Sequence, residues 1–170
     1  TVLLPFCKDN QQVFVCRSED DGETWSTPTE ITSEVKDSSW SWVATGPGHG
    51  IQLTNGRLLI PACANDSPPP TPWRDPRADS LGYLQSSYAL FSDDHGKTWQ
   101  RGAKMTLDAS DEFEAVEMSD GTVYANMRSR QGRNCRASAW SRNGGETWSE
   151  VRYDPSLPEP SCQGSIVRFD

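Results

Sequence analysis

The chain comprises 170 residues, of which 34% are hydrophobic and seven are tryptophan, a composition that suits one folded domain with a buried core. Its 24 acidic and 16 basic side chains give a formal net charge of −8, which argues against nucleic acids and anionic membranes as partners because both attract basic surfaces. No apolar run approaches the roughly 20 residues of a transmembrane helix.

An eight-residue motif occurs three times, at 18–25, 92–99 and 141–148, with the pattern Ser-x-Asp/Asn-x-Gly-x-Thr-Trp. The Asp or Asn side chain can accept hydrogen bonds from the backbone N–H groups that follow it, and the glycine permits a positive φ angle. We therefore predict a tight turn at each octet, with the indole lying beneath the turn. The octets are interpreted as folding elements on the outside of a sheet, not as active or metal sites.

Between the octets, short β-type runs alternate with turn residues in a repeating order. Residues 1–7 match the second strand of the later units. The next unit has predicted strands at 48–53, 57–64, 86–91 and 100–104, with a proline-rich surface loop inserted at 65–85. The third unit has predicted strands at 113–118, 122–129, 135–140 and 149–153. Residues 163–169 then match the first strand of a further unit.

A period near 50 residues with four antiparallel strands per unit is typical of the blades of a β-propeller. We predict an all-β fold, a β-propeller fragment with four-stranded antiparallel blades. The predicted division of 1–170 is an incomplete blade at 1–44, blades at 45–104 and 105–153, and the start of the next blade at 154–170. Because a propeller closes with four to eight blades, we expect the chain to be the middle of a longer protein.

Glu112 is the first candidate for chemistry. The innermost strands of a propeller line its central channel, and the repeat alignment places Pro47, Glu112 and Gln163 at equivalent positions where these strands begin. We therefore expect Glu112 and Gln163 to be neighbours. A carboxylate where the repeat otherwise has Pro and Gln favours a functional role, although a solvated glutamate in an acidic stretch at 108–114 stays open as the alternative.

Arg128 is the second candidate, because the equivalent positions of the other units hold Cys7 and Cys63. An arginine in place of a small, buried residue implies a carboxylate partner or an anionic ligand, since an isolated buried guanidinium is costly. The arginines that follow it are expected to be solvent residues. They are Arg130, Arg133 and Arg136.

Cysteine and histidine side chains show no metal-binding pattern. The five cysteines are an odd number without a Cys-x-x-Cys pair, so we predict neither a disulfide framework nor a zinc site. Only Cys7 and Cys16, which flank a turn, are weighed as a bridge. His49 and His95 are too far apart to indicate a metal cluster, and no phosphate-binding glycine loop is present. The sequence therefore implies no metal and no cofactor.

Taken together, these motifs resemble the sialidase (neuraminidase) family. The octets resemble its Asp-box, or BNR repeat, and further similarities follow in the family's order along the chain. They are TGPGHGIQL at 45–53, GRLLIP at 56–61, EFEAVEM at 112–118, Asn-Met-Arg at 126–128 and CQGS at 162–165. Asp-boxes also occur in non-catalytic propellers, so the segments between them carry most of the specificity.

Members of this family are six-bladed propellers that hydrolyse terminal α-linked sialic acids with retention of configuration. By position, Glu112 resembles the glutamate that activates a tyrosine nucleophile, Arg128 one of three arginines that clamp the sialate carboxylate, and Gln163 a pocket residue beside them. The resemblance implies a central fragment of an exo-α-sialidase. Its expected partners are sialylated glycans: glycoproteins, glycolipids and oligosaccharides.

The resemblance places the other catalytic groups outside residues 1–170, namely the acid/base aspartate, two further arginines and the tyrosine, so we expect the isolated chain to be inactive. A non-catalytic Asp-box propeller that binds glycans or proteins is the alternative. Glu112 and Arg128 discriminate between the two, because a binding module has no need of both at adjacent channel positions. An enzyme requires their side chains within about 10 Å of each other, the reach of one ligand.

Overall fold

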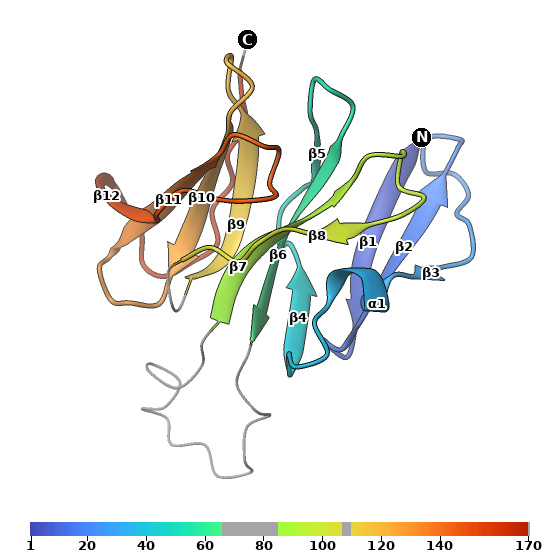
Figure 1. Cartoon of the computed structure of the whole chain (residues 1–170), viewed down its shortest axis with the longest axis horizontal. Coiled ribbons are helices and arrows are strands. Elements are labelled where there is room, and N and C mark those ends of the chain that lie inside the picture. Colours follow the sequence, from blue (N-terminus) through green and yellow to red (C-terminus); the bar gives the residue numbers. More distant parts are fainter. Residues whose placement is uncertain (66–84, 107–109, 170) are drawn as a thin grey trace.

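The computed structural model describes residues 1–65, 85–106 and 110–169 of the chain. Nearly all of the proline-rich loop predicted at 65–85 lies outside these residues. Three antiparallel sheets, each built from consecutive strands, lie side by side in a fan (Figure 1). The predicted all-β class is confirmed. Within the described ranges, no helix has the length and apolar character needed to cross a membrane.

The first sheet is the smallest of the three. Its strands, in the order β1-β2-β3, are β1 (Val2–Lys8), β2 (Gln12–Ser18) and β3 (Thr29–Glu30). A single helical turn, α1 (Thr32–Val35), follows and buries Val35. Cys7 and Cys16, weighed above as a bridge, are both free thiols.

The strand predicted at 48–53 in the second sheet is reduced to residues 51–52, and a further short strand that was not predicted precedes it at 42–45. The strands of this sheet are β4 (Trp42–Thr45), β5 (Ile51–Gln52), β6 (Leu58–Asn65), β7 (Gln85–Ser92) and β8 (Gln100–Arg101). Both β4 and β5 pair with β6, and residues 46–50 leave the sheet between them. Gly46 and Gly48, at φ angles of +80° and +112°, adopt backbone conformations that interrupt a strand.

This interruption corrects the repeat alignment at Pro47. The residue that pairs with Cys63 is Ala44, because the extra residues of the 46–50 segment shift the register of the strand. Pro47 therefore does not occupy the position of Glu112.

The third sheet matches its predicted order most closely. Its strands, in the order β12-β11-β10-β9, are β9 (Ser110–Glu117), β10 (Val123–Ser129), β11 (Cys135–Ser141) and β12 (Arg152–Pro158). The last strand, predicted at 149–153, begins and ends later, because residues 149–151 are irregular and the pairing with β11 starts at Arg152. The division of the chain into blades at 44, 104 and 153 stays a prediction.

Residues 163–169 are not a strand, contrary to prediction, but they run beside β9 in the same direction. Ser165 Oγ contacts the carboxylate of Glu114, and the Arg168 side chain donates to the backbone of Glu117, each pair being 51 residues apart in sequence. The segment thus keeps the register in which Gln163 was aligned with Glu112, without the ladder of backbone hydrogen bonds that defines a strand.

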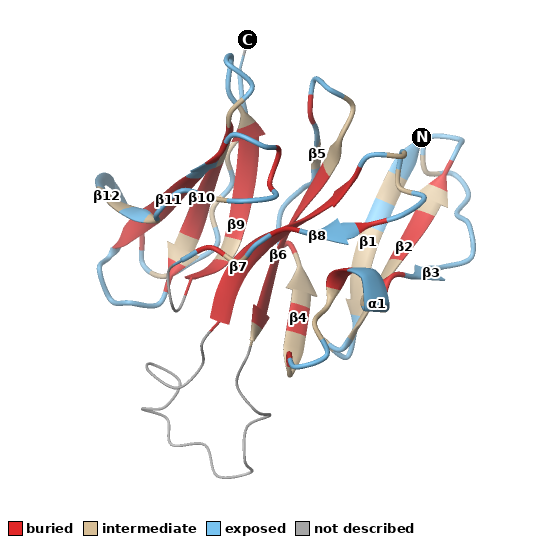
Figure 2. Ribbon diagram, in the orientation of Figure 1, coloured by how far each residue is buried: buried red, intermediate tan, exposed pale blue. Residues whose placement is uncertain are grey.

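The two long strands of the middle sheet, β6 and β7, are buried on both faces (Figure 2). Along β6, Ile60 packs into an apolar cluster shared with the first sheet, while Leu59 packs into a second cluster shared with the third sheet. Successive side chains of a strand point to opposite faces, so a strand between two cores must be apolar throughout. This explains the continuous apolar run at 58–64.

The three octets form equivalent turns, as predicted. In the first, Ser18 Oγ accepts the N–H of Gly22 at 2.8 Å, and Asp20 Oδ1 accepts the N–H of Thr24 at 2.9 Å. The second and third octets repeat both bonds. The octet glycines have the required positive φ angles, +93° at Gly22, +80° at Gly96 and +91° at Gly145.

Candidate functional site

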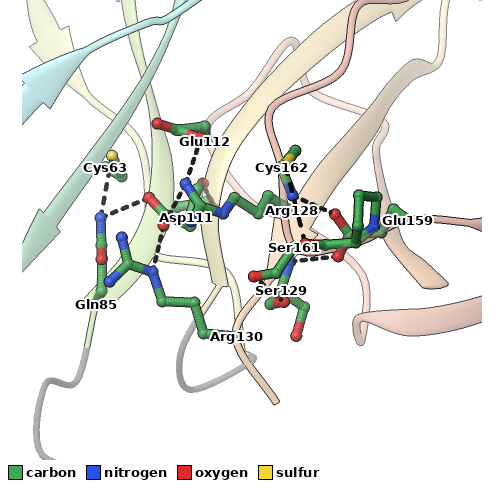
Figure 3. A network of polar contacts seen from close by, with 12 residues as sticks. Cys63, Gln85, Asp111, Glu112, Arg128, Ser129, Arg130, Glu159, Ser161 and Cys162 are labelled. Carbon is green, nitrogen blue, oxygen red and sulfur yellow. Dashed lines mark hydrogen bonds and ion pairs between the residues drawn. The ribbon is translucent and has the colours of Figure 1, made fainter. Parts of the chain in front are cut away.

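The candidate site forms where β9 begins and β10 ends, at an irregularity in their pairing. Met127 pairs with Phe113, and the next pair along the strands is Ser129 with Ser110. Two residues of β9, Asp111 and Glu112, therefore lie opposite the single residue Arg128 of β10. Such a β-bulge bends the strand locally and re-aims side chains, and here it turns two carboxylates toward one guanidinium (Figure 3).

Glu112 and Arg128 are in direct contact. Arg128 Nη1 donates to Glu112 Oε2 at 2.8 Å and lies 3.5 Å from Asp111 Oδ2. Burial disfavours the charged guanidinium, but the hydrogen bond to Glu112 and the charge of Asp111 outweigh it and raise the pKa of Arg128. The predicted convergence of Glu112 and Arg128 is confirmed by this geometry.

Among the described residues, the guanidinium of Arg128 leaves its Nη2 side unpaired. Its Nε is buried and has no hydrogen-bond partner, and among the described residues nothing accepts a hydrogen bond from its Nη2. The side chain is 22% exposed and that of Glu112 is 23% exposed, so both can be reached from solvent. An arginine held at one nitrogen and open at another can bind an anionic group by charge-assisted hydrogen bonds.

Asp111 lies behind this pair and is only 2% exposed. Its Oδ1 accepts a hydrogen bond from Gln85 Nε2 at 2.6 Å, and its Oδ2 accepts one from Arg130 Nε at 2.7 Å. Arg130, expected to be a solvent residue, is indeed exposed, with 39% of its side chain accessible, but it is paired with Asp111. The Asp111 network reaches from β7 of the middle sheet to the end of β10, as Figure 3 shows.

Arg136 is a second correction, because it is buried rather than solvent-exposed. Its Nε donates to Asn126 Oδ1 at 2.6 Å, its Nη1 donates to the carbonyl of Cys162 at 2.8 Å, and Glu159 lies 3.6 Å away as its counter-ion. Burial lowers the pKa of Arg136. Glu159 also accepts the N–H of Cys162. The ion pair of Arg136 with Glu159 therefore holds the 159–162 loop against β10 and β11. Nothing in the sequence marked Glu159, since its partner is 23 residues away.

Gln163 follows directly after this loop and is exposed. Its amide donates to Ser165 Oγ at 3.3 Å, and among the described residues it makes no hydrogen bond to Glu112 or Arg128. The structure therefore places Gln163 in the predicted register but does not bring its side chain into hydrogen-bond contact with Glu112 or Arg128.

Glu114 belongs to the stretch 108–114 for which solvent exposure was left open as the alternative, yet it is 1% exposed in the middle of β9. It accepts the N–H of Ile166 at 2.8 Å, and His49 Nε2 lies 3.8 Å from the same oxygen. A Cβ atom on Gly48 would stand only 2.1 Å from its other oxygen. Glu114 thus joins the 46–50 segment, β9 and the segment after residue 160. The alternative of a solvated acidic stretch does not hold for Glu114 or Asp111.

A cleft of about 730 Å³ lies elsewhere, between β1 and β6. Its lining is mainly apolar, with Leu3, Ile51 and Trp99 among the lining residues, and it contains neither Glu112 nor Arg128. Within residues 1–65, 85–106 and 110–169, no three or more His, Cys, Asp or Glu side chains gather in a way that could hold a metal ion. The ionisable side chains that the described residues bring together at the candidate site are carboxylates and arginines.

Comparison with known proteins gives a consistent result. Residues 7–168 match the family described as BNR repeat-like domain. The chain is 34% identical over 157 residues to a sialidase of Bacteroides fragilis, of which it covers 26%. It is 35% identical over 167 residues to sialidase-4 of Homo sapiens, of which it covers 32%. These matches include 92% and 89% of the chain, respectively.

Solved structures agree with these matches. A Hadza microbial sialidase superimposes with a TM-score of 0.70 at 31% identity, over 89% of this chain and 27% of that protein. The intramolecular trans-sialidase from Ruminococcus gnavus, solved in complex with oseltamivir carboxylate, superimposes with a TM-score of 0.67 at 28% identity, over 86% of this chain and 27% of that protein. The chain thus spans about a quarter to a third of the length of these four relatives.

Proposed function

The chain belongs to the family of BNR repeat-like domains and is homologous to sialidases, and from this membership we propose that it forms part of the active site of an exo-α-sialidase. The proposed substrates are terminal α-linked sialic acids on glycoproteins, glycolipids and oligosaccharides. The proposed reaction is hydrolysis with retention of configuration. A tyrosine outside residues 1–170 is the proposed nucleophile.

The observation that carries this proposal is the contact of Glu112 and Arg128 at the β-bulge. A strand that served only to pack a sheet would not need two carboxylates opposite one arginine, because buried charges are costly unless they are paired. Here the charges are paired, yet the outer two remain accessible to a ligand. Such an accessible pair is the arrangement that binding and proton transfer require.

We assign Arg128 the role of binding the carboxylate of the sugar. Sialic acid carries a carboxylate on its anomeric carbon, and the free edge of the Arg128 guanidinium can donate to it. Because the chain as a whole has a charge of −8, attraction of this anionic substrate has to come from local arginines.

We assign Glu112 the role of general base toward the tyrosine. The anomeric carboxylate would repel an anionic nucleophile, whereas a neutral tyrosine that gives its proton to Glu112 as it attacks avoids this repulsion. As the tyrosine oxygen bonds to the anomeric carbon, the glycosidic bond breaks and the leaving oxygen takes a proton from the acid/base aspartate proposed outside residues 1–170. Water then hydrolyses the covalent glycosyl-enzyme intermediate, as in other retaining glycosidases. Gln163 is proposed to contact the bound sugar, since its exposed amide lies on the segment that runs beside β9.

Steady-state hydrolysis of a sialoside by the full-length polypeptide that carries these residues tests the proposal. Glu112→Gln is expected to lower kcat by about 100-fold or more with a small change in KM, which is the typical scale of general base catalysis. Arg128→Ala is expected mainly to raise KM, by about tenfold or more, because a charge-assisted hydrogen bond to the substrate is lost. Release of no sialic acid by the wild-type protein, or equal and negligible effects of both changes, would refute the proposal in favour of a binding module.

A further inference from the structure

Asp111 is the one carboxylate of the bulge to which the proposed reaction gives no role. It is fixed from two sides, by Gln85 Nε2 at 2.6 Å and by Arg130 Nε at 2.7 Å, and its own backbone carbonyl accepts the hydroxyl of Ser87. These partners come from the start of β7 and from the residue that follows β10. Asp111 is therefore held in place by neighbours from two sheets.

The bulge sets Asp111 against Arg128 as a second, inner counter-ion. Arg128 Nη1 lies 2.8 Å from Glu112 and 3.5 Å from Asp111. The two carboxylates differ in access, because Glu112 is 23% exposed whereas Asp111 is 2% exposed. A ligand or a reacting group can thus displace or protonate Glu112, while Asp111 stays out of reach.

The rest of the guanidinium has little else to hold it. Arg128 Nε is buried without a partner, and Nη1 is the nitrogen that carries its hydrogen bond within the described chain. If Glu112 moves or takes up a proton during a reaction cycle, the attraction between Asp111 and Nη1 is what keeps the guanidinium oriented. The opposite edge, with Nη2, then remains available to an anion.

We propose that Asp111 is a positioning residue, which holds the Arg128 guanidinium through Nη1 and so fixes the direction in which its free edge meets a ligand carboxylate. Gln85 and Arg130 in turn hold Asp111. The role in substrate binding rests on the proposed function, whereas the orientation of Arg128 does not depend on it.

Nuclear magnetic resonance of the Arg128 side chain tests this orientation without any substrate. Its Nε–H group is buried, so the proton is expected to exchange slowly and to give a sharp signal in the full-length protein, assigned by its loss in Arg128→Lys. Asp111→Ala is expected to broaden or shift this signal. Asp111→Asn, which keeps an acceptor oxygen toward Arg128, is expected to preserve it. An unchanged signal in Asp111→Ala overturns the proposal.

Gln85→Ala serves as a second variant if Asp111→Ala does not fold. It removes the amide that donates to Asp111 Oδ1 and, more distantly, to Cys63 Sγ. It is expected to broaden the same signal to a smaller extent, whereas an unchanged signal again overturns the proposal. Asp93→Ala is the matched control, because it breaks an Asp–Arg pair, that of Asp93 with Arg57, at a distant octet. It is expected to leave the Arg128 signal unchanged.

Sialoside kinetics separate this inference from the proposed function. Asp111→Ala is expected to raise KM about tenfold with kcat changed less than about threefold, and Asp111→Asn is expected to restore most of the KM. A fall in kcat alone, with KM unchanged, contradicts a positioning role. If the wild-type protein hydrolyses no sialoside, the proposed function fails, and the magnetic resonance result still decides whether Asp111 orients Arg128.

Discussion

The second and third sheets share one repeat but differ sharply at two equivalent positions. Cys63 and Arg128 both stand seven residues after the glycine of the preceding turn, and Ser87 and Arg136 both stand five residues before an octet serine. Cys63 is fully buried in β6 and pairs with Ala44, whereas Arg128 faces two carboxylates across a bulge.

The first strands of the two sheets differ as well, while the octet turns are alike. The hydrogen bonds of the octets agree from sheet to sheet within about 0.1 Å. The first strand is broken at 46–50 in the second sheet and carries a two-for-one bulge at 111–112 in the third. The repeat therefore preserves the elements that fold each sheet and varies the strand on which the candidate chemistry lies.

The largest effect is expected when Arg136 of the third sheet is replaced by serine, the residue at the equivalent position 87 of the second sheet. Arg136→Ser leaves the buried carboxylate of Glu159 without its counter-ion, and removing one partner of a buried pair typically lowers the free energy of unfolding by about 3–5 kcal/mol. Chemical denaturation measures it. Arg133→Ser is the control, since Arg133 is exposed and its replacement is expected to lower the free energy of unfolding by less than about 1 kcal/mol. If both variants lowered the free energy of unfolding equally, Arg136 would not stabilise the fold through its pair with Glu159.

A smaller effect is expected where the broken strand of the second sheet meets the third. In Gly48→Ala, the new methyl group would overlap the carboxylate of Glu114 at a φ of +112°, and we expect a loss of about 2–4 kcal/mol from overpacking and backbone strain. Gly56→Ala is the matched control, because its φ is +93° with open space around the added atom, so only the strain of about 1 kcal/mol remains. If denaturation midpoints shift equally, the close approach of Gly48 to Glu114 is refuted.

The smallest effect is expected at the octets, where the pH dependence of stability distinguishes the two that contain Asp from the one that contains Asn. Hydrogen bonds from the side chain and backbone of Thr24 lower the pKa of Asp20 to about 2, and the bonds of Thr98 likewise lower the pKa of Asp94. A carboxyl whose pKa is lower in the folded state contributes stability above the unfolded pKa of about 4, and this contribution is lost as the pH falls toward 2. The third octet has Asn143 instead, which donates to Thr147 and does not titrate.

Asp20→Asn is therefore expected to reduce the fall of the melting temperature between pH 4 and pH 2, and Asn143→Asp is expected to steepen it. Thermal unfolding across this range, followed by circular dichroism, is the measurement. Identical slopes in the wild type and both variants would mean that the octet carboxylates do not link folding to pH.

The sequence predicted the parts of the fold that local chemistry determines. Octet turns and the strands beside them follow from residues within eight positions of one another, and the contact of Glu112 with Arg128 follows from the hairpin that joins β9 and β10. Prediction failed where register depends on distant contacts. The alignment of Pro47 did not allow for the extra residues at 46–50, which shift the register of the first strand. The burial of Arg136 depends on its contact with Glu159, which lies in the loop after β12.

The central claim is that Arg128 binds the carboxylate of a sialic acid, and its most direct test compares two ligands in two proteins. The dissociation constants of a non-hydrolysable α-thiosialoside and of its carboxyl methyl ester are measured by calorimetry for the full-length wild type and for Arg128→Ala. We predict that the wild type prefers the acid by more than about tenfold, and that Arg128→Ala lowers this preference by about tenfold, the contribution of one charge-assisted hydrogen bond. An undiminished preference for the acid in Arg128→Ala would contradict the account.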